Sequence, residues 1–361
     1  MSTLAALTTT GVGGPAAGTV EVSTEDELIA AVRDADANHT PVLLIAGGSN
    51  LLIGDEGFDG TAIVVRSSGI DFNDEAGSCG GTFLTVQAGH VWDEVVAASL
   101  EHGSVGLEPL SGIPGSAGAT PFQNVGAYGT DVSHTLASVR VWDRVENRIR
   151  TLFNGDLDFG YRTSLLKTTN YVPGIAYAPR FVVLSVDFQL LPGDLSAPIR
   201  YTQLADALGV TVGAKAPAAE VREAVLALRD SKGMVYRPGD PDTHSTGSFF
   251  TNPIVDAATA ARLPESAPCY PDPRGVKLSA AWLIENAGFA KGYGLPGTPG
   301  ANITGGRASL STKHTLALTN RGDASAADIT ALALHVRDGV ERAFGIRLHP
   351  EPLVVSSSAD W

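Results

Sequence analysis

The sequence predicts an α+β protein with more than one domain, and three observations support this. The chain has 361 residues, which corresponds to two or three domains at about 150 residues each. Helical and strand patterns are interspersed, and the first buried strand runs into a turn-rich loop instead of a helix. A Gly-, Ala- and Pro-rich patch, "GVTVGAKAPAA", indicates a domain boundary near residue 212.

The N-terminal part is expected to hold one helix and two strands. Ser23 is the predicted N-cap of the helix, which presents Leu28 on its apolar face. The strands are expected at 41–48 and 61–66, because each is an apolar run bounded by turn residues.

The middle part combines strands with one short helix. Apolar spacing predicts the helix over 91–102, closed by Gly103. Alternating residues predict a hairpin over 138–152 with "RVEN" at its tip, and further strands at 82–89 and 180–191.

Three helices and a final strand are expected in the C-terminal part. The first helix has its apolar residues at Val221, Val225 and Leu228, which share one face. A Pro- and Gly-rich loop separates the second helix from the third. The expected ranges are 219–233, 279–290 and 326–344 for the helices and 352–355 for the strand.

The charge of the chain argues against binding to nucleic acids or anionic membranes. Its formal net charge is −14, so its long-range field repels polyanions, and any bound anion must be held by a few local cations. The sequence contains no run of about 18 apolar residues, which is the length needed to span a bilayer. The first basic residue is Arg33, so the basic segment of a secretory signal is missing. We therefore expect a cytoplasmic protein.

The cysteines and histidines do not predict a metal site. Cys79 and Cys269 are too few for a disulfide framework or a thiolate site. The histidines lack H-E-x-x-H spacing. A serine hydrolase is also unsupported, because no G-x-S-x-G turn follows a strand.

One glycine-rich stretch imitates a dinucleotide-binding motif. "GYGLPG" at 292–297 satisfies G-x-G-x-x-G, but Pro296 and Pro299 forbid the helix that should receive a pyrophosphate. No strand precedes it either. We therefore expect no nucleotide at this stretch.

A second stretch, "IAGGSNLLI", is better placed to approach a phosphate. A buried strand ends at Gly47 and Gly48, where missing Cβ atoms allow backbone N–H groups to come close, and Ser49 and Asn50 add side-chain donors. No helix follows, which excludes a Rossmann turn and a P-loop. Taken alone, the stretch is equally compatible with a tight turn that joins two strands.

The stretch "PLSGIPGSAGATPFQNVGAYG" at 109–129 provides another long cradle of backbone. Its side chains Ser116, Thr120, Gln123 and Asn124 can form hydrogen bonds with a flat heterocycle or with its phosphates. Tyr128 is a further large side chain that a mere linker would not need.

Together, the two cradles resemble the FAD-binding domain of the vanillyl-alcohol-oxidase (PCMH) type. More narrowly, "IPGSAGATPFQNVGAYG" is similar, nearly position for position, to the central signature of the UDP-N-acetylenolpyruvoylglucosamine reductase family. The resemblance implies noncovalent FAD, with NADPH as co-substrate. The FAD contacts that it implies are Gly47, Gly48, Ser49, Asn50, Leu51, Ile113, Gly115, Ser116, Thr120, Gln123, Asn124 and Gly126.

The resemblance to this family extends over the whole chain. "TTTGVGGPA" resembles its opening segment, although Gly11 replaces a larger residue, and "FGYRTSLLK", "LRDSKGMV", "GSFFTNP" and "LHPEPLVV" resemble later segments. The implied substrate is UDP-N-acetylglucosamine enolpyruvate, and Tyr201 indicates the subtype with a tyrosine loop. The implied substrate contacts are Tyr161, Tyr201, Lys232 and Asn252.

The implied fold is a two-part FAD-binding domain, 1–75 and 76–212, followed by a C-terminal α+β substrate-binding domain, 213–361. The implied partners are small molecules only, with no nucleic acid and no membrane, and we expect a monomer.

Three catalytic residues follow from the resemblance. Hydride transfer to the enolpyruvyl double bond builds negative charge next to the carboxylate, where the planar guanidinium of Arg162 can bind. Ser248 is the implied proton donor, since a positioned hydroxyl can protonate a strongly basic carbanion. An ionised Glu351 would repel the substrate carboxylate, so we expect it to be protonated or to share a proton.

Two other functions stay open. One is a flavin oxidase that passes electrons to oxygen, and the other is a nucleotide-sugar-binding protein without redox activity. Arg162 could also be a structural ion-pair partner, Ser248 could cap a turn, and Glu351 could be a solvated loop residue. Their occurrence together, in family order, favours the reductase.

Overall fold

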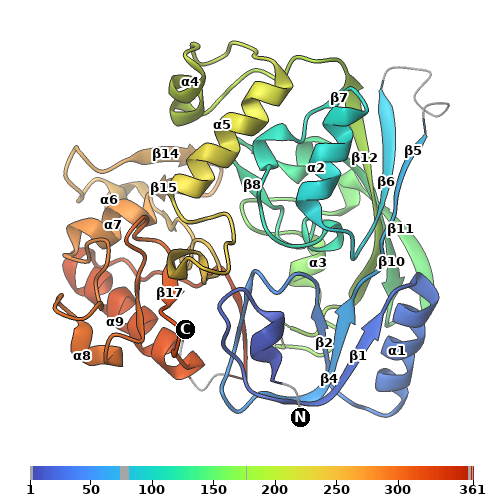
Figure 1. The fold of residues 1–361 in the computed structure, drawn as a ribbon, viewed down its shortest axis with the longest axis horizontal. Helices are drawn as coiled ribbons and strands as arrows, with labels where there is room; N and C mark the ends of the chain where they lie inside the picture. Colours follow the sequence, from blue (N-terminus) through green and yellow to red (C-terminus); the bar gives the residue numbers. More distant parts are fainter. Residues whose placement is uncertain (1–2, 74–80, 176, 357–358, 360) are drawn as a thin grey trace. The chain divides into compact units, whose positions relative to one another are not determined.

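The computed structural model describes residues 3–73, 81–175, 177–356, 359 and 361 (Figure 1). The chain forms two compact units, each with helices and strands, as expected for an α+β protein. The division into domains at residues 75 and 212 stays a prediction. Unit 1 consists of Met1–Pro15, Gly48–Phe58 and Tyr236–Trp361, and unit 2 of Ala16–Gly47 and Asp59–Val235.

A three-stranded sheet with one helix forms part of unit 2. The strand order is β1 (Ala16–Val22), β4 (Phe58–Val65) and β2 (Val42–Ile45), and β2 is parallel to β4. Helix α1 (Glu25–Ala37) buries its apolar face in the same core. Its N-cap is Thr24 and not Ser23 as predicted, because the Thr24 side chain and Glu27 form a capping box.

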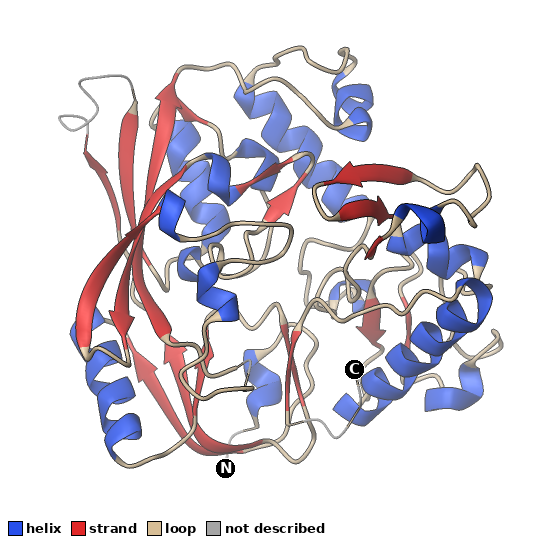
Figure 2. Cartoon of the chain, turned by 180° about the vertical axis from the view of Figure 1, so that it is seen from behind, coloured by secondary structure: helices blue, strands red, loops and turns tan. Residues whose placement is uncertain are grey.

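An antiparallel sheet forms the largest layer of unit 2, and Figure 2 shows its strands side by side. The predicted hairpin is confirmed, since Asp143 pairs with Arg148 across its tip. The strand order is β11 (Arg148–Phe153), β10 (Leu136–Asp143), β12 (Phe181–Pro192), β6 (Thr82–Gln87) and β5 (Ile70–Asn73), and β7 (Ser104–Val105) pairs with β12.

Four α-helices complete the described part of unit 2 after α1. Gly103, with φ of 74°, follows the C-cap of α2 as predicted. Val221 and Val225 on the last helix are fully buried against the preceding one. The helices are α2 (Trp92–Glu101), α3 (Leu165–Thr168), α4 (Thr202–Leu208) and α5 (Ala218–Ser231), and two short strands, β8 (Gly126–Ala127) and β9 (Thr130–Asp131), pair as a hairpin.

Unit 1 packs helices against small sheets. Helix α9 (Ala326–Phe344) coincides with its predicted range and buries Ile329, Leu332 and Val336 in the core of the unit. The other elements of its C-terminal part are β13 (Ile254–Val255), α6 (Ala257–Ala260), β14 (Cys269–Asp272), β15 (Gly275–Leu278), α7 (Ala280–Asn286), α8 (Ala301–Thr304), β16 (Ala308–Leu310) and β17 (Leu318–Asn320).

N-terminal segments complete unit 1. Strand β3 (Leu51–Ile53) lies in the loop that was expected to consist of turns, and it pairs in parallel with β18 (Leu353–Val355). Val12 and Leu52 belong to the same core as α9. The Asp55 carboxylate accepts hydrogen bonds from the first backbone N–H groups of α9.

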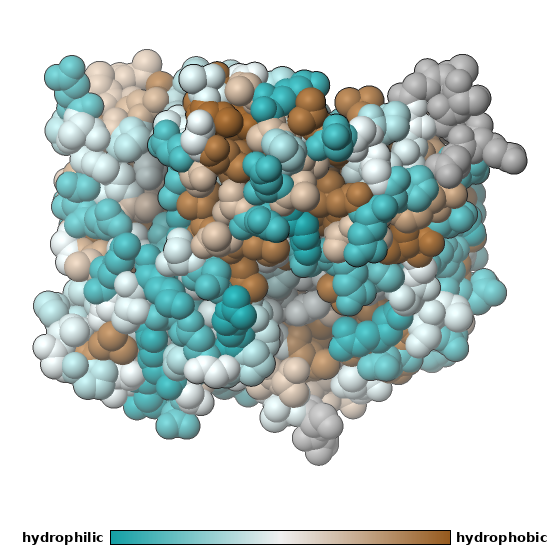
Figure 3. Space-filling model, turned by 45° about the horizontal axis from the view of Figure 1, so that its top comes forward, coloured by the Kyte–Doolittle hydropathy of each residue, from teal (hydrophilic) through white to brown (hydrophobic). Residues whose placement is uncertain are grey.

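Hydrophobic and hydrophilic residues are interspersed on the face seen in Figure 3. None of the helices in the described ranges has the length and apolar character that crossing a membrane requires. Cys269 is exposed and unpaired, whereas Cys79 lies outside the described residues.

Candidate active site

The two predicted cradles meet in unit 2 at a pair of glycines. A Cβ atom on Gly47 would lie 2.7 Å from Cα of Gly115, which is closer than real contacts allow. The next residue, Gly48, has φ of 63°, and a Cβ there would overlap the carbonyl oxygen of Leu7. Glycine is therefore required at both positions, because the backbone itself fills the space.

The second cradle holds an unpartnered polar atom. Backbone hydrogen bonds from Ala117 to His90 and from Gly118 to Ala88 fix its path. Ser116 is only 4% exposed, and its hydroxyl has no hydrogen-bond partner among the described residues. A buried hydroxyl without a partner is destabilising, so this group fits a polar cofactor that would supply the missing bond. Ile113 is partly buried and packs against the hydrophobic core that contains Ala117.

Other polar residues of the second cradle bind protein groups. The Thr120 hydroxyl donates to the carbonyl of Ala117 at 2.8 Å. Asn124 has φ of 48°, donates from Nδ2 to the carbonyl of Gly160, and accepts from the backbone of Ser133. Gln123 is 9% exposed. The Asn124 side chain thus connects this cradle to the turn that carries Arg162.

Arg162 is held beside the second cradle by its own contacts. One guanidinium nitrogen donates to the carbonyl of Gly126 at 2.9 Å, and the guanidinium lies 5.4 Å from the ring centre of Tyr161. Its backbone has φ of 55°, a conformation that residues other than glycine rarely adopt. Such conformations cluster at functional sites. The structure therefore brings Arg162, Gly126 and Asn124 together.

A cluster of rings and cations forms a second group of candidate residues in unit 2. The Tyr201 ring meets the Tyr128 ring edge-on, with centres 5.7 Å apart. The Lys232 Nζ lies 5.8 Å from the centre of the Tyr128 ring and donates to Oε1 of Gln203 at 2.6 Å. Tyr201 and Lys232 were predicted to bind substrate, and they share Tyr128 as a neighbour.

Arg229 was not predicted, although it is the most unusual cation of this cluster. It is 9% exposed, and its Nε has no partner among the described residues. Burial, with a smaller effect of the Arg162 charge, lowers its pKa to about 10, although the Tyr128 hydroxyl and the Asp93 carboxylate act in the opposite direction. The neighbouring carboxylate, Asp93, already binds Arg222 through two hydrogen bonds.

A sequence signal for Arg229 did exist. It follows Val221 and Val225 at four-residue spacing, which places a cation on the buried face of α5. Arg229 lies in the last turn of α5 and Lys232 is its C-cap, where the partial negative charge of the helix end stabilises cations.

In unit 1, backbone pairing brings Ser248 and Glu351 together. Glu351 donates from its backbone to the carbonyl of Phe249, and Thr251 donates to the carbonyl of His349. Asn50 joins this group, since its Nδ2 donates to the carbonyl of Glu351 at 3.4 Å. In the described part of the chain, no hydrogen bond or ion pair involves the Ser248 side chain. Among these residues, the hydroxyl is thus uncommitted.

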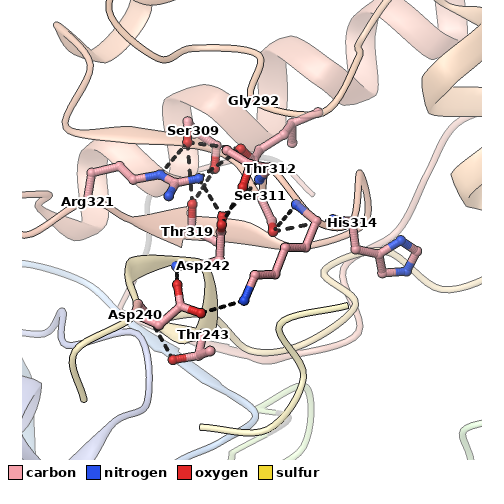
Figure 4. Close-up of polar contacts among 12 residues, drawn as sticks. Asp240, Asp242, Thr243, Gly292, Ser309, Ser311, Thr312, His314, Thr319 and Arg321 are labelled. Carbon is pink, nitrogen blue, oxygen red and sulfur yellow. Dashed lines mark hydrogen bonds and ion pairs between the residues drawn. The ribbon is translucent and has the colours of Figure 1, made fainter. Parts of the chain in front are cut away.

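A polar network fixes the segment before Ser248 (Figure 4). The Asp242 carboxylate accepts from the backbone and the hydroxyl of Thr312 and from Arg321, which also donates to Ser309. Lys313 donates to Asp240 at 2.6 Å. Burial alone would raise the pKa of Asp242, but the hydrogen bonds from Thr312 and the charge of Arg321 outweigh it and lower that pKa.

The remaining predicted residues of unit 1 have structural contacts. Asn252 accepts a hydrogen bond through Oδ1 from the backbone of Ala280 at the start of α7. Leu51 begins β3 and is 8% exposed. Ser49 precedes Asn50 in the turn before β3. Within the described ranges, no group of three or more His, Cys, Asp or Glu side chains could hold a metal ion.

Two protein families match consecutive parts of the chain. Residues 16–151 match an FAD binding domain. Residues 240–355 match the C-terminal domain of UDP-N-acetylenolpyruvoylglucosamine reductase. The predicted fold class, α+β with an FAD-binding domain before a C-terminal domain, is thereby confirmed.

Curated relatives are similar over nearly the whole chain. The UDP-N-acetylenolpyruvoylglucosamine reductase of Nocardia farcinica is 54% identical over 98% of this chain and 88% of its own length. That of Thermobifida fusca is 50% identical over 98% of this chain and 96% of its own length.

A solved structure has a similar fold. The UDP-N-acetylenolpyruvylglucosamine reductase of Thermus caldophilus superposes with a TM-score of 0.62 at 23% identity. The alignment covers 98% of this chain and 97% of that one.

Proposed function

Because the chain belongs to the UDP-N-acetylenolpyruvoylglucosamine reductase family, we propose that it reduces UDP-N-acetylglucosamine enolpyruvate to UDP-N-acetylmuramate with NADPH. A hydride adds to the terminal carbon of the enolpyruvyl double bond, a proton adds to the adjacent carbon, and NADPH becomes NADP⁺. FAD, when bound, supplies the hydride carrier that links the two substrates. The reaction is a step of peptidoglycan precursor synthesis.

The observation that carries this proposal is the pairing of Phe249 with Glu351. It sets Ser248, the proposed proton donor, next to the proposed acidic residue. The Ser248 hydroxyl makes no protein hydrogen bond in the described residues, so its proton is available to a substrate carbon. An oxidase would have no use for a proton donor to an enolate.

Arg162 is the residue that we propose for stabilising the negative charge formed on the substrate. Arg162 would bind the carboxylate, where negative charge grows as the hydride arrives. Lys232 would bind the diphosphate, with Tyr161 and Tyr201 as further substrate contacts, while Asn252 of unit 1 keeps its proposed substrate role.

The cradles that meet at Gly47 and Gly115 would hold FAD without a covalent bond. The proposed FAD contacts are the twelve residues from Gly47 to Gly126 that the resemblance implies. The hydroxyl of Ser116, which has no partner among the described residues, is the strongest support for a polar ligand there. We also propose that the protein acts as a monomer in the cytoplasm, where sugar nucleotides and NADPH are found.

Anaerobic spectroscopy tests the proposal. The purified protein should be yellow, lose its flavin absorbance on addition of NADPH, and recover it on addition of the enolpyruvyl sugar nucleotide. Recovery with oxygen but not with the sugar nucleotide would favour an oxidase. A colourless protein that binds the sugar nucleotide would favour the non-redox alternative.

A further inference from the structure

Lys232 is held on two sides by groups that leave its charge intact. Its Nζ donates to Oε1 of Gln203 at 2.6 Å and lies over the Tyr128 ring. An amide oxygen is a neutral acceptor, and an aromatic ring attracts a cation without removing its charge. No carboxylate pairs with Lys232 in the described part of the chain. Two of its three N–H donors are therefore left for another acceptor.

The position of Gln203 is fixed by the packing of its helix. Gln203 lies in the first turn of α4, whose N-cap is Tyr201. The next two residues, Leu204 and Ala205, are each 1% exposed and share a core with Val221 of α5. The Gln203 amide is thus carried on a packed element, while its own side chain is exposed.

We propose that Gln203 is a positioning residue for the diphosphate of the nucleotide substrate. It holds the Lys232 ammonium over Tyr128 so that two N–H donors point away from the protein and toward phosphate oxygens. The inference rests on the proposed function, since Lys232 is assigned there to the diphosphate. Because Gln203 follows Tyr201 by two residues, the same contact joins the tyrosine segment to the phosphate-binding lysine.

The surrounding charge supports an anionic ligand at this point. Among the described residues, the buried Nε of Arg229 has no hydrogen-bond partner, and the nearby carboxylate of Asp93 is bound by Arg222. The charge of Arg229 acts on both Lys232 and Tyr128. Burial, and then the charge of Arg229, lower the pKa of Lys232. Two cations held close together in a chain of net charge −14 mark a local site for anions. A neutral amide preserves this charge, whereas a carboxylate at position 203 would cancel part of it.

Calorimetric titration of the FAD-loaded protein with UDP and with uridine tests the proposal. Gln203→Ala should weaken UDP binding about 3- to 10-fold, because a lost hydrogen bond leaves the lysine less ordered. Gln203→Glu should weaken it by at least about 10-fold through charge pairing. Neither change should alter uridine binding, since uridine has no phosphate. Thr202→Ala, an exposed neighbour on the same helix turn, is the control and should leave both affinities unchanged.

A double-mutant cycle separates positioning from a structural role. In a Lys232→Met background, neither substitution of Gln203 should weaken UDP binding further. NMR titration should show a higher pKa for Lys232 in the Gln203→Glu single variant than in the wild-type protein, because the ammonium gains a carboxylate partner.

Unchanged UDP affinity in the Gln203 variants, or equal losses with and without Lys232, would overturn the proposal. Equal losses for UDP and uridine would also do so. UDP binding by a wild-type protein that does not turn over the enolpyruvyl substrate would refute the reductase but leave the Gln203 test valid. A wild-type protein that does not bind UDP would refute both.

Discussion

The hydroxyl of Ser116 is expected to destabilise the FAD-free protein and to strengthen the binding of FAD. Its hydroxyl is buried and unpartnered among the described residues, which destabilises the protein by about 1–3 kcal/mol. Ser116→Ala should therefore raise the melting temperature of the FAD-free protein. It should also weaken FAD binding by about 2- to 10-fold, the worth of one hydrogen bond.

Ser111 offers a matched control for Ser116. It is also fully buried, but its hydroxyl donates to the carbonyl of Glu108 at 2.7 Å. Ser111→Ala should lower the melting temperature with and without FAD. If Ser116→Ala lowered the melting temperature of the FAD-free protein in the same way, the hydroxyl would have a structural role instead.

Ser248 is predicted to act in one half of the reaction. Ser248→Ala should leave reduction of the flavin by NADPH intact and slow reoxidation by the enolpyruvyl substrate by about 10²-fold or more, because general acid catalysis contributes on that scale. Rapid-mixing absorbance at the flavin band measures each half separately. Ser248→Cys, which keeps an acidic proton, should recover part of the rate. Equal slowing of both halves would assign Ser248 a structural role.

Most candidate residues could be predicted from the sequence, but their supporting neighbours could not. Arg162, Ser248 and Glu351 lie in segments that resemble those of the reductase family. Gln203 has no such signal, because its importance comes from a contact with Lys232, 29 residues away. Tyr128 stood out as a large residue in a glycine-rich stretch, yet only the structure shows that its ring lies next to both Lys232 and Tyr201.

At the scale of elements, one buried carboxylate organises the tip of the β10–β11 hairpin. Asp143 is fully buried and accepts hydrogen bonds from Arg150, from Arg180 and from the backbone of Val145 and Glu146. Burial would raise its pKa, but the bonds from Arg180 and Arg150 outweigh this and hold the pKa well below its usual 3.8.

The lowered pKa gives a dependence of stability on pH with a definite sign. The native carboxylate binds its proton less tightly than the unfolded one, so the interaction stabilises the fold above about pH 4 and is lost as the pH falls below it. Asp143→Asn should lower the free energy of unfolding by about 1–3 kcal/mol at pH 7, and this deficit should shrink toward pH 3. Urea unfolding at the two pH values measures it.

Asp59 provides the comparison for Asp143. It is exposed on β4, and Asp59→Asn should change stability little at either pH. A deficit in Asp143→Asn that stayed constant down to pH 3 would contradict the assigned role of its charge.

Elements that are fixed by contacts between residues close in sequence could be predicted, whereas elements that depend on distant residues could not. Helix α9 was predicted to its ends because Ser325 and Asp328 form a capping box and Gly345 closes it. The N-cap of α1 was predicted one residue too early, at Ser23, because serine and threonine cap helices about equally well and only the contact with Glu27 identifies Thr24. Strand β3 was missed, since its partner is β18, about 300 residues later, and no local pattern reports such a pairing.

At the scale of the whole molecule, unit 1 is assembled from three separate stretches. Its core includes Val12 and Leu52, its strand β18 pairs with β3, and Asp55 caps α9. A fragment of residues 236–361 should therefore lack a cooperative unfolding transition, because it would lose core side chains, a strand partner and a helix cap together. Circular dichroism during heating measures this. A sharp transition near that of the full chain would refute it.

The discontinuity of unit 1 also orders events on the ribosome. Every stretch of unit 2 has been synthesised once Val235 emerges, so this unit can fold while the remainder of the chain is still being made. Residues 48–58 have left the ribosome long before, but β3 has no strand to pair with until β18, among the last residues, appears. Until then the apolar segment Leu51–Ile53 lacks the strand partner that it has in the folded protein, and we expect chaperones to bind it.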